Sequence, residues 1–154
     1  MEQTRGYRDL KAWQKGIKLA APVYELVKKL PREELFEMSA QMRKAVVSVP
    51  ANIAEGQARR EPGEFLYHLG VARGSLAELD TLIEVGIEVG YFAREAVSPL
   101  ADLITELRRI LQGLITAIEN HSGLASPVTP TRPWPKWPRT ANPARTTEIR
   151  NPPA

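Results

Sequence analysis

The chain has 154 residues, of which 43% are hydrophobic and 25% are charged, with a formal net charge of +3; these values are ordinary for one folded domain. The absence of cysteine excludes disulfides, thiolate nucleophiles and cysteine-ligated zinc, and it agrees with a reducing compartment. No apolar run approaches the roughly 18 residues that cross a bilayer, and the first residues lack the apolar core of a secretory signal, so we expect a cytoplasmic protein without membrane contact.

The first predicted helix covers about residues 10–27. Asp9 is its expected N-cap, and Pro22 is expected to bend it or to remove one of its hydrogen bonds. Apolar residues spaced by three and four predict one buried stripe. This stripe consists of Leu10, Trp13, Ile17, Ala20, Tyr24 and Val27.

The second predicted helix covers about residues 38–59. Pro50 is expected to break or kink its middle, because proline is the commonest cause of a kink, and Gly56 is expected to mark the approach of its end. The residues predicted to face inward are Met42, Ala45, Val46, Val49 and Ile53.

The third predicted helix covers about residues 62–89 and contains Gly70 and Gly74, four residues apart. Each glycine destabilises a helix by on the order of 1 kcal/mol relative to alanine, and we expect close approach of a neighbouring helix to offset this. The fourth predicted helix, about residues 94–121, has an apolar arc wider than one seam requires. We expect the excess to form a subunit interface, although three neighbouring helices in the same chain would also bury it. The main stripe is Leu100, Leu103, Leu107, Leu111, Leu114 and Ile118, flanked by Ile104, Ile110 and Ile115.

Helical patterns joined by short connections predict an all-α fold, an antiparallel up-down-up-down four-helix bundle over residues 1–121. From residue 122 to 154 the composition changes, because aliphatic residues become few and eight prolines follow residue 126. Such a segment buries too little apolar surface to offset the entropy of ordering, so we expect a disordered, proline-rich tail.

We find no pattern that predicts catalysis. His68 and His121 lack partners at metal-ligand spacing, and neither a G-x-S-x-G motif nor a phosphate-binding glycine loop occurs. The acidic residues of the third helix read as a solvated or partner-facing side. We therefore expect no catalytic residue, metal, cofactor or small-molecule substrate.

Positive charge is unevenly distributed and suggests where an anion would bind. Residues 1–60 carry 12 bases and 7 acids, residues 61–121 carry 4 and 10, and residues 122–154 carry 5 and 1. Lysines spaced by four and three on the first helix share a face, and basic residues recur on the second, so these helices could neutralise phosphates. An ordinary solvated surface, or pairing with the acidic third helix, is the alternative. The candidates are Lys11, Lys15, Lys18, Arg43, Lys44, Arg59 and Arg60.

The tail contains a second candidate, in which tryptophans alternate with cations and prolines. Aromatic rings can stack on unpaired bases while cations meet phosphates. A docking peptide for a groove on another protein, or a terminus without function, would have the same composition. The residues concerned are Arg132, Trp134, Lys136, Trp137 and Arg139.

The string S-V-P-A-N-I-A-E-G at residues 48–56, with D-L-K-A-W before it and G-S-L-A-E-L-D after it, resembles the bacterial four-helix-bundle proteins encoded in 23S rRNA intervening sequences. The resemblance covers about residues 7–119. It implies a protomer that assembles into a homopentamer, and a related branch includes accessory proteins of diversity-generating retroelements, which bind a reverse transcriptase and its RNA through a basic surface. The signature residues, which we interpret as structural, are Ser48, Pro50, Asn52, Glu55 and Gly56.

The sequence thus favours a non-enzymatic oligomeric adaptor that binds RNA or a ribonucleoprotein, with RNA or a reverse transcriptase as the partner. The alternative is a structural or protein-binding homo-oligomer with no role in nucleic-acid binding. In that case the basic N-terminal half of one copy would pair with the acidic C-terminal half of another.

Overall fold

The computed structural model describes residues 6–124, and the fold of this part is all-α, as predicted. Five α-helices and two short 3-10 helices account for it, and no strand occurs among these residues. The elements are η1 (Tyr7–Asp9), α1 (Lys11–Lys18), α2 (Ala20–Val27), η2 (Arg32–Glu34), α3 (Met38–Arg59), α4 (Pro62–Glu88) and α5 (Arg94–Ser122).

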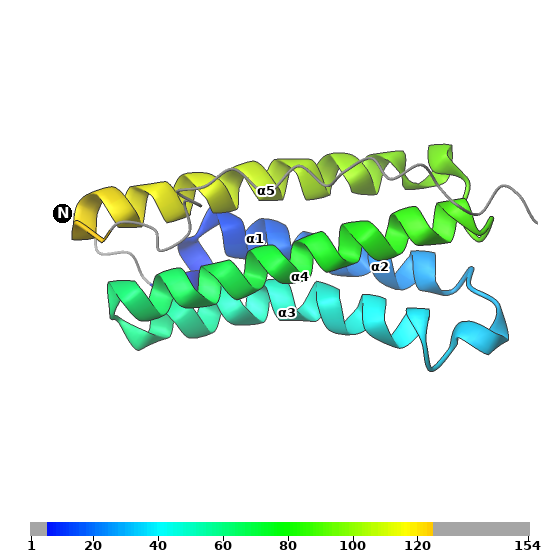
Figure 1. Cartoon of the computed structure of the whole chain (residues 1–154), viewed down its shortest axis with the longest axis horizontal. Coiled ribbons are helices and arrows are strands. Elements are labelled where there is room, and N and C mark those ends of the chain that lie inside the picture. Colours follow the sequence, from blue (N-terminus) through cyan, green and yellow to red (C-terminus); the bar gives the residue numbers. More distant parts are fainter. Residues whose placement is uncertain (1–5, 125–154) are drawn as a thin grey trace, which may run out of the picture.

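The helices lie side by side along one long axis (Figure 1). α1 and α2 follow one another in line, and α3, α4 and α5 each run the length of the molecule, successive members in opposite directions. We call the end that holds η1, the α3–α4 connection and the last turn of α5 the N-terminal end. None of the helices in residues 6–124 combines the length and apolar character needed to cross a bilayer.

The predicted first helix is two helices, separated at Leu19. Proline cannot donate a backbone hydrogen bond within a helix, but it is tolerated in the first turn, where the N–H groups have no partner. The interruption places Pro22 in the first turn of α2, and the Leu19 N–H instead bonds the Gly16 carbonyl, three residues back. Asp9 is not the N-cap: it lies in η1, and Leu10 occupies the cap without a side-chain hydrogen bond.

The predicted buried stripe of the first helix is wrong at two positions. Ile17 and Tyr24 are 46% and 42% exposed. A neighbouring face is buried instead. The lack of a side chain at Gly16 lets α1 lie close to α3, since a β-carbon there would lie only 3.3 Å from the Pro50 Cβ. The residues buried on this face are Ala12, Gly16, Leu19, Val23, Leu26 and Val27.

α3 runs without interruption through Pro50, so the predicted break is absent. Gly56 does not mark the end of α3 either: it is buried three residues before that end, against α4. The helix stops where Arg60 adopts a left-handed conformation with φ of 63°. The five residues predicted to face inward are all buried.

Two expectations for the last two helices are not met within the chain. No atom comes within 4 Å of a β-carbon built at Gly70 or Gly74, so no neighbouring helix of residues 6–124 approaches these glycines. On α5, Ile104 and Ile115 are buried in the core of the protomer itself and Ile110 is half-buried, because α5 packs against both α4 and α1. A subunit interface is therefore not needed to explain these isoleucines.

Charged side chains connect α5 to its neighbours. Arg94 binds Glu84 at 3.1 Å, and Arg108 binds Asp80 at 2.7 Å, so part of the acidic side of α4 is paired with α5. Lys15 of α1 binds Glu106 of α5 at 2.9 Å.

Candidate functional site

A chain of polar side chains connects α3 to α4 at the signature residues. The Asn52 amide donates to the Ser48 carbonyl at 2.9 Å and lies 3.0 Å from the Ser48 hydroxyl. The Ser48 and Ser75 hydroxyls share a hydrogen bond of 2.8 Å across the two helices. The Asn52 carbonyl oxygen lies 3.1 Å from Nδ1 of His68. Since no buried side-chain polar atom of residues 6–124 lacks a partner, this network is fully satisfied.

His68 links the buried network to an exposed ion pair. Its side chain is 10% exposed, and its Nε2 lies 3.9 Å from Glu55, whose carboxylate accepts a 2.9 Å hydrogen bond from Arg59. That hydrogen bond, followed by the electrostatic effect of His68, lowers the pKa of Glu55 below its ordinary value of 4.5. The same hydrogen bond raises the pKa of Arg59.

The network of Ser48, Asn52, His68 and Ser75, with Glu55 beside it, has a structural geometry, and we call it the clamp. Nucleophilic catalysis needs a hydroxyl within hydrogen-bonding reach of a base, but His68 faces Asn52 and Glu55, and Ser48 faces Asn52 and Ser75. No group of three His, Asp or Glu side chains in residues 6–124 is placed to hold a metal ion. Sequence reasoning identified Ser48, Asn52 and Glu55 but missed His68 and Ser75, because their partners lie on the other helix.

The predicted basic residues do not form one patch. Lys11, Lys18 and Lys44 are exposed, whereas Lys15 is half-buried against Glu106. On α3, Arg43 donates to the Ser39 hydroxyl at 3.2 Å. A helix rises about 1.5 Å per residue, so the basic pairs at residues 43–44 and 59–60 lie roughly 25 Å apart along α3.

The tail residues lie outside the described part of the chain. They are Arg132, Trp134, Lys136, Trp137 and Arg139.

An aromatic and cationic cluster at the N-terminal end was not predicted. The Tyr7 and Trp13 rings are 5.4 Å apart, and the Arg8 guanidinium lies 5.6 Å and 5.5 Å from their centres. Arg8 is exposed, and the Gln14 amide donates to its carbonyl at 2.9 Å. The spacing of Arg8 to Tyr7 and Trp13 could have suggested it, but Trp13 was assigned to the core. Lys11, the first residue of α1, is also exposed.

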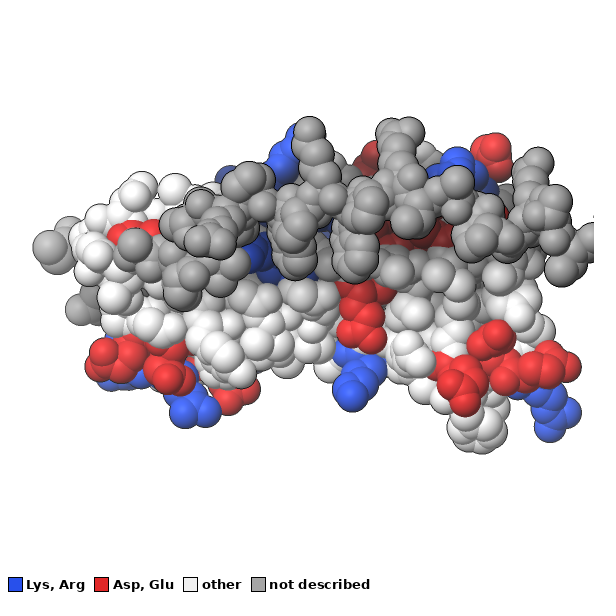
Figure 2. All heavy atoms as spheres, in the orientation of Figure 1, with Lys and Arg blue, Asp and Glu red and all other residues white. Residues whose placement is uncertain are grey.

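A strip of mostly uncharged residues covers the outward side of α4. We call this strip the outer face of α4. Glu78 is the one charged residue among its positions. The nearby charged residues Arg73, Asp80 and Glu84 are directed to α5, where each binds a partner. On the side seen in Figure 2, uncharged side chains make up most of the uncovered surface between the charged groups along the lower edge. The outer face consists of Tyr67, Gly70, Val71, Gly74, Ala77, Glu78, Thr81 and Val85, all exposed.

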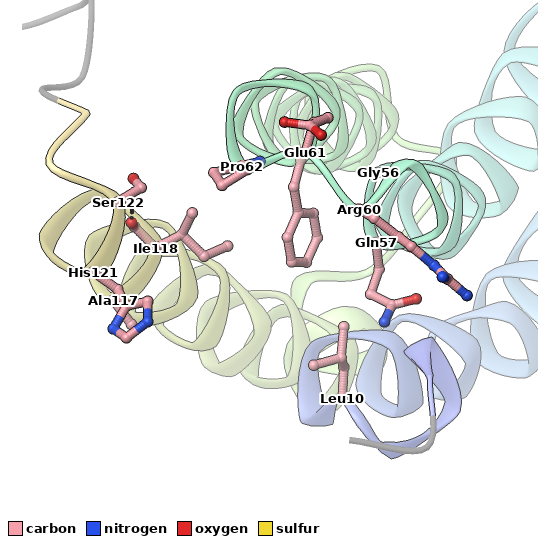
Figure 3. Close-up of a pocket in the computed structure, with 11 residues that line it drawn as sticks. Leu10, Gly56, Gln57, Arg60, Glu61, Pro62, Ala117, Ile118, His121 and Ser122 are labelled. Atoms are coloured by element: carbon pink, nitrogen blue, oxygen red, sulfur yellow. Dashed lines mark hydrogen bonds between the residues drawn. The ribbon is translucent and has the colours of Figure 1, made fainter. Parts of the chain in front are cut away.

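A pocket of about 440 Å³ opens at the N-terminal end. Leu10, at the N-cap of α1, and Ile118, on α5, extend into it, and Arg60 points away (Figure 3). Its lining is Leu10, Gly56, Gln57, Arg60, Glu61, Pro62, Phe65, Ala117, Ile118, His121 and Ser122.

Comparison with known proteins identifies the family. A family model described as "23S rRNA-intervening sequence protein" matches residues 8–113, which include the clamp and all of the core of α3 and α4. The chain belongs to this family. No curated protein matches it.

A solved structure also resembles this chain. It is a protein of unknown function from the S23 ribosomal protein family of Bacteroides thetaiotaomicron, whose crystal structure is 26% identical to this chain with a TM-score of 0.62. The match covers 68% of this chain and 95% of that one. The family model ends at residue 113, so the tail after residue 124 lies outside the matched region.

Proposed function

We propose that this member of the intervening-sequence family is a non-enzymatic scaffold that self-associates through the outer face of α4. The proposal rests on the combination of open glycines with a single charged residue, Glu78, on that face. Gly70 and Gly74 have no neighbour within 4 Å of a β-carbon position, and Tyr67 beside them is 67% exposed.

The glycines support a second copy as the occupant. Each weakens α4 by on the order of 1 kcal/mol relative to alanine, and the packing within the protomer does not offset this. Small residues let two helices approach closely. A helix from another copy could therefore pack on Gly70 and Gly74 and bury the neighbouring side chains of Tyr67 and Val71. Five copies are the number that the family resemblance implies, and a closed ring would use this face in a repeated contact.

The test is the mass of the full chain in solution, measured by light scattering at micromolar concentration. The wild-type protein should have a mass several times 17.2 kDa, about 86 kDa if five copies associate. Gly74→Lys adds a charge where the protomer has open space, so it should keep the helical circular dichroism spectrum and shift the mass toward one copy.

Gly113→Lys is the matched control, because Gly113 is a helical glycine on α5 that also has open space around it. It should leave the mass unchanged. A wild-type protein that is monomeric at these concentrations would refute the proposal.

A second candidate function, an adaptor that binds RNA or a ribonucleoprotein such as a reverse transcriptase with its RNA, is favoured by the Tyr7–Arg8–Trp13 cluster. A cation beside two aromatic rings offers stacking and phosphate contacts together, and the exposed Lys11 and Lys18 lie on the adjoining helix. The five basic residues of the tail add charge to the same chain.

This function is tested by titrating a fluorescent single-stranded RNA with the full chain at two salt concentrations. Phosphate contacts predict an affinity that falls steeply with salt. Arg8→Gln should weaken binding, and Lys28→Gln, a control at the opposite end that breaks only the exposed pair with Glu25, should not. If the full chain binds no RNA at low salt, the adaptor function is excluded and the scaffold stands alone.

A further inference from the structure

The pocket at the N-terminal end lies where the described chain ends. Leu10, Phe65 and Ile118, all half-buried, line it from three separate segments. Its volume of about 440 Å³ is within the range of sites that bind ligands, roughly 300–1,000 Å³. Nothing in residues 6–124 fills it, so these apolar side chains have room for a further group.

The tail begins at the edge of this pocket. His121 and Ser122 are two of the lining residues, and the α5 helix ends at Ser122. Trp134 follows Leu124 by ten residues, which span at most about 33–36 Å when extended. So short a connection keeps the tryptophans close to the pocket and gives them a high effective concentration there.

The chemistry of the tail matches the pocket. A buried tryptophan contributes a large apolar surface, which Leu10, Phe65 and Ile118 would cover. The prolines at 133, 135 and 138 restrict the unbound segment to extended conformations, which lowers the entropy lost on docking. At the rim, Glu61 offers a carboxylate to Lys136 or an arginine, while Arg60 is directed away from the cavity (Figure 3).

We infer that the segment of residues 132–139 docks in the N-terminal pocket of its own chain, with a tryptophan on Leu10, Phe65 and Ile118. Docking would join the tail to the α3–α4 connection and to the last turn of α5. It uses surface distinct from the outer face of α4, so it does not depend on the proposed scaffold function.

Limited trypsin digestion of the full chain tests the docking. The bonds after Lys136 and Arg139 lie in the docked segment, and the bond after Arg150 lies beyond it. Cleavage that requires a segment to leave its site reports the fraction of open molecules, so the two inner bonds should be cut about tenfold more slowly than the outer one.

Two variants connect this protection to the pocket. Ala117→Phe fills the pocket from an exposed lining position and should make the inner bonds as sensitive as the outer bond. Ala101→Phe, at an exposed position elsewhere on α5, should leave the protection intact. Acrylamide quenching provides a second measurement: in a Trp13→Phe protein only Trp134 and Trp137 fluoresce, and Ala117→Phe should increase their quenching.

Three results would overturn the inference. The inner and outer bonds could be cut equally fast in the wild-type protein, which means that the tail does not dock. Protection that survives Ala117→Phe would place the segment elsewhere. Protection that grows with protein concentration would mean that the pocket holds the tail of another copy.

Discussion

Gly56 is a signature position at which α3 lies against α4 with no room for a side chain. A β-carbon there would lie 2.7 Å from the His68 Cβ and 3.0 Å from the Phe65 Cδ2. His68 cannot move aside freely, because Nδ1 lies 3.1 Å from the Asn52 amide oxygen. Gly56 therefore has a steric role, whereas its place in the sequence led us to expect the approach of a helix end.

Gly56→Ala should destabilise the protein by about 1–3 kcal/mol, the usual range for overpacking. Gly113→Ala is the control, since its β-carbon meets nothing within 4 Å and alanine stabilises a helix by up to about 1 kcal/mol relative to glycine. Urea unfolding followed by circular dichroism measures both. If the two variants are equally stable, the contact with His68 does not limit the separation of the helices.

Glu55 gives the clamp a dependence on pH. Its pKa is lowered by the Arg59 hydrogen bond and by His68, so folding favours the ionised form. The stability it contributes is present above the unfolded-state pKa, near 4.5, and is lost as the pH falls through the lower folded-state value.

Glu55→Gln should therefore lower the melting temperature at neutral pH and reduce the further loss that the wild-type protein shows below about pH 4.5. Melting curves of both proteins from pH 7 to about pH 3 test this. Glu95→Gln, at an exposed position in the first turn of α5, controls for removal of a carboxylate. Parallel pH profiles for wild type and Glu55→Gln would contradict the assignment.

At the scale of elements, the sequence predicted the helices well and the buried face of the first one poorly. Periodicity placed α3, α4 and α5 within a few residues of their observed bounds, because long apolar repeats are dominated by burial. The same reasoning placed Ile17 and Tyr24 in the core because they continue the spacing of three and four. The decisive interaction is between Gly16 and Pro50, a contact between segments that no local pattern contains.

The partners of the clamp were hidden for the same reason. Asn52 and Ser48 are four residues apart on one helix and could be connected from spacing alone, whereas Ser75 and His68 meet them only once α4 packs on α3. The isoleucines of α5 show the converse error. Their excess was assigned to a subunit interface, but α1 and α4 both cover α5 and bury Ile104 and Ile115.

The corrected face of α1 and α2 makes a direct prediction. Leu19 is fully buried, so Leu19→Ala should reduce the free energy of unfolding by about 2–5 kcal/mol. Ile17→Ala, two residues away at a 46% exposed position, should change it by less than about 1 kcal/mol. Chemical denaturation of both variants measures the difference, and the reverse order of stabilities would restore the stripe inferred from periodicity.

At the scale of the whole molecule, one hydrophobic core connects all the long elements. The buried cluster extends without division from Ala12 in α1 to Ile115 in α5. Residues 1–60 are basic and residues 61–121 acidic, yet among residues 6–124 Lys15–Glu106 is the only Lys or Arg ion pair between these halves, beside the 3.9 Å contact of His68 with Glu55. Burial of apolar surface, more than charge, therefore holds the halves of the protomer together.

A single core predicts a single unfolding transition. At about 0.7 kcal/mol per residue, the calorimetric enthalpy of the bundle should be on the order of 80 kcal/mol per chain. Circular dichroism and, in a Trp134→Phe/Trp137→Phe protein, the fluorescence of Trp13 should change at the same temperature. Two separated transitions would show that α1 and α2 unfold independently of α3–α5.

Self-association adds a dependence on concentration to the same experiment. A complex that binds only folded chains raises the melting temperature as the protein concentration rises. The wild-type melting temperature should therefore increase over a hundredfold range of concentration, and that of Gly74→Lys should stay constant because its association surface carries a charge. If both temperatures are independent of concentration, the outer face of α4 does not associate, and its open glycines need another explanation.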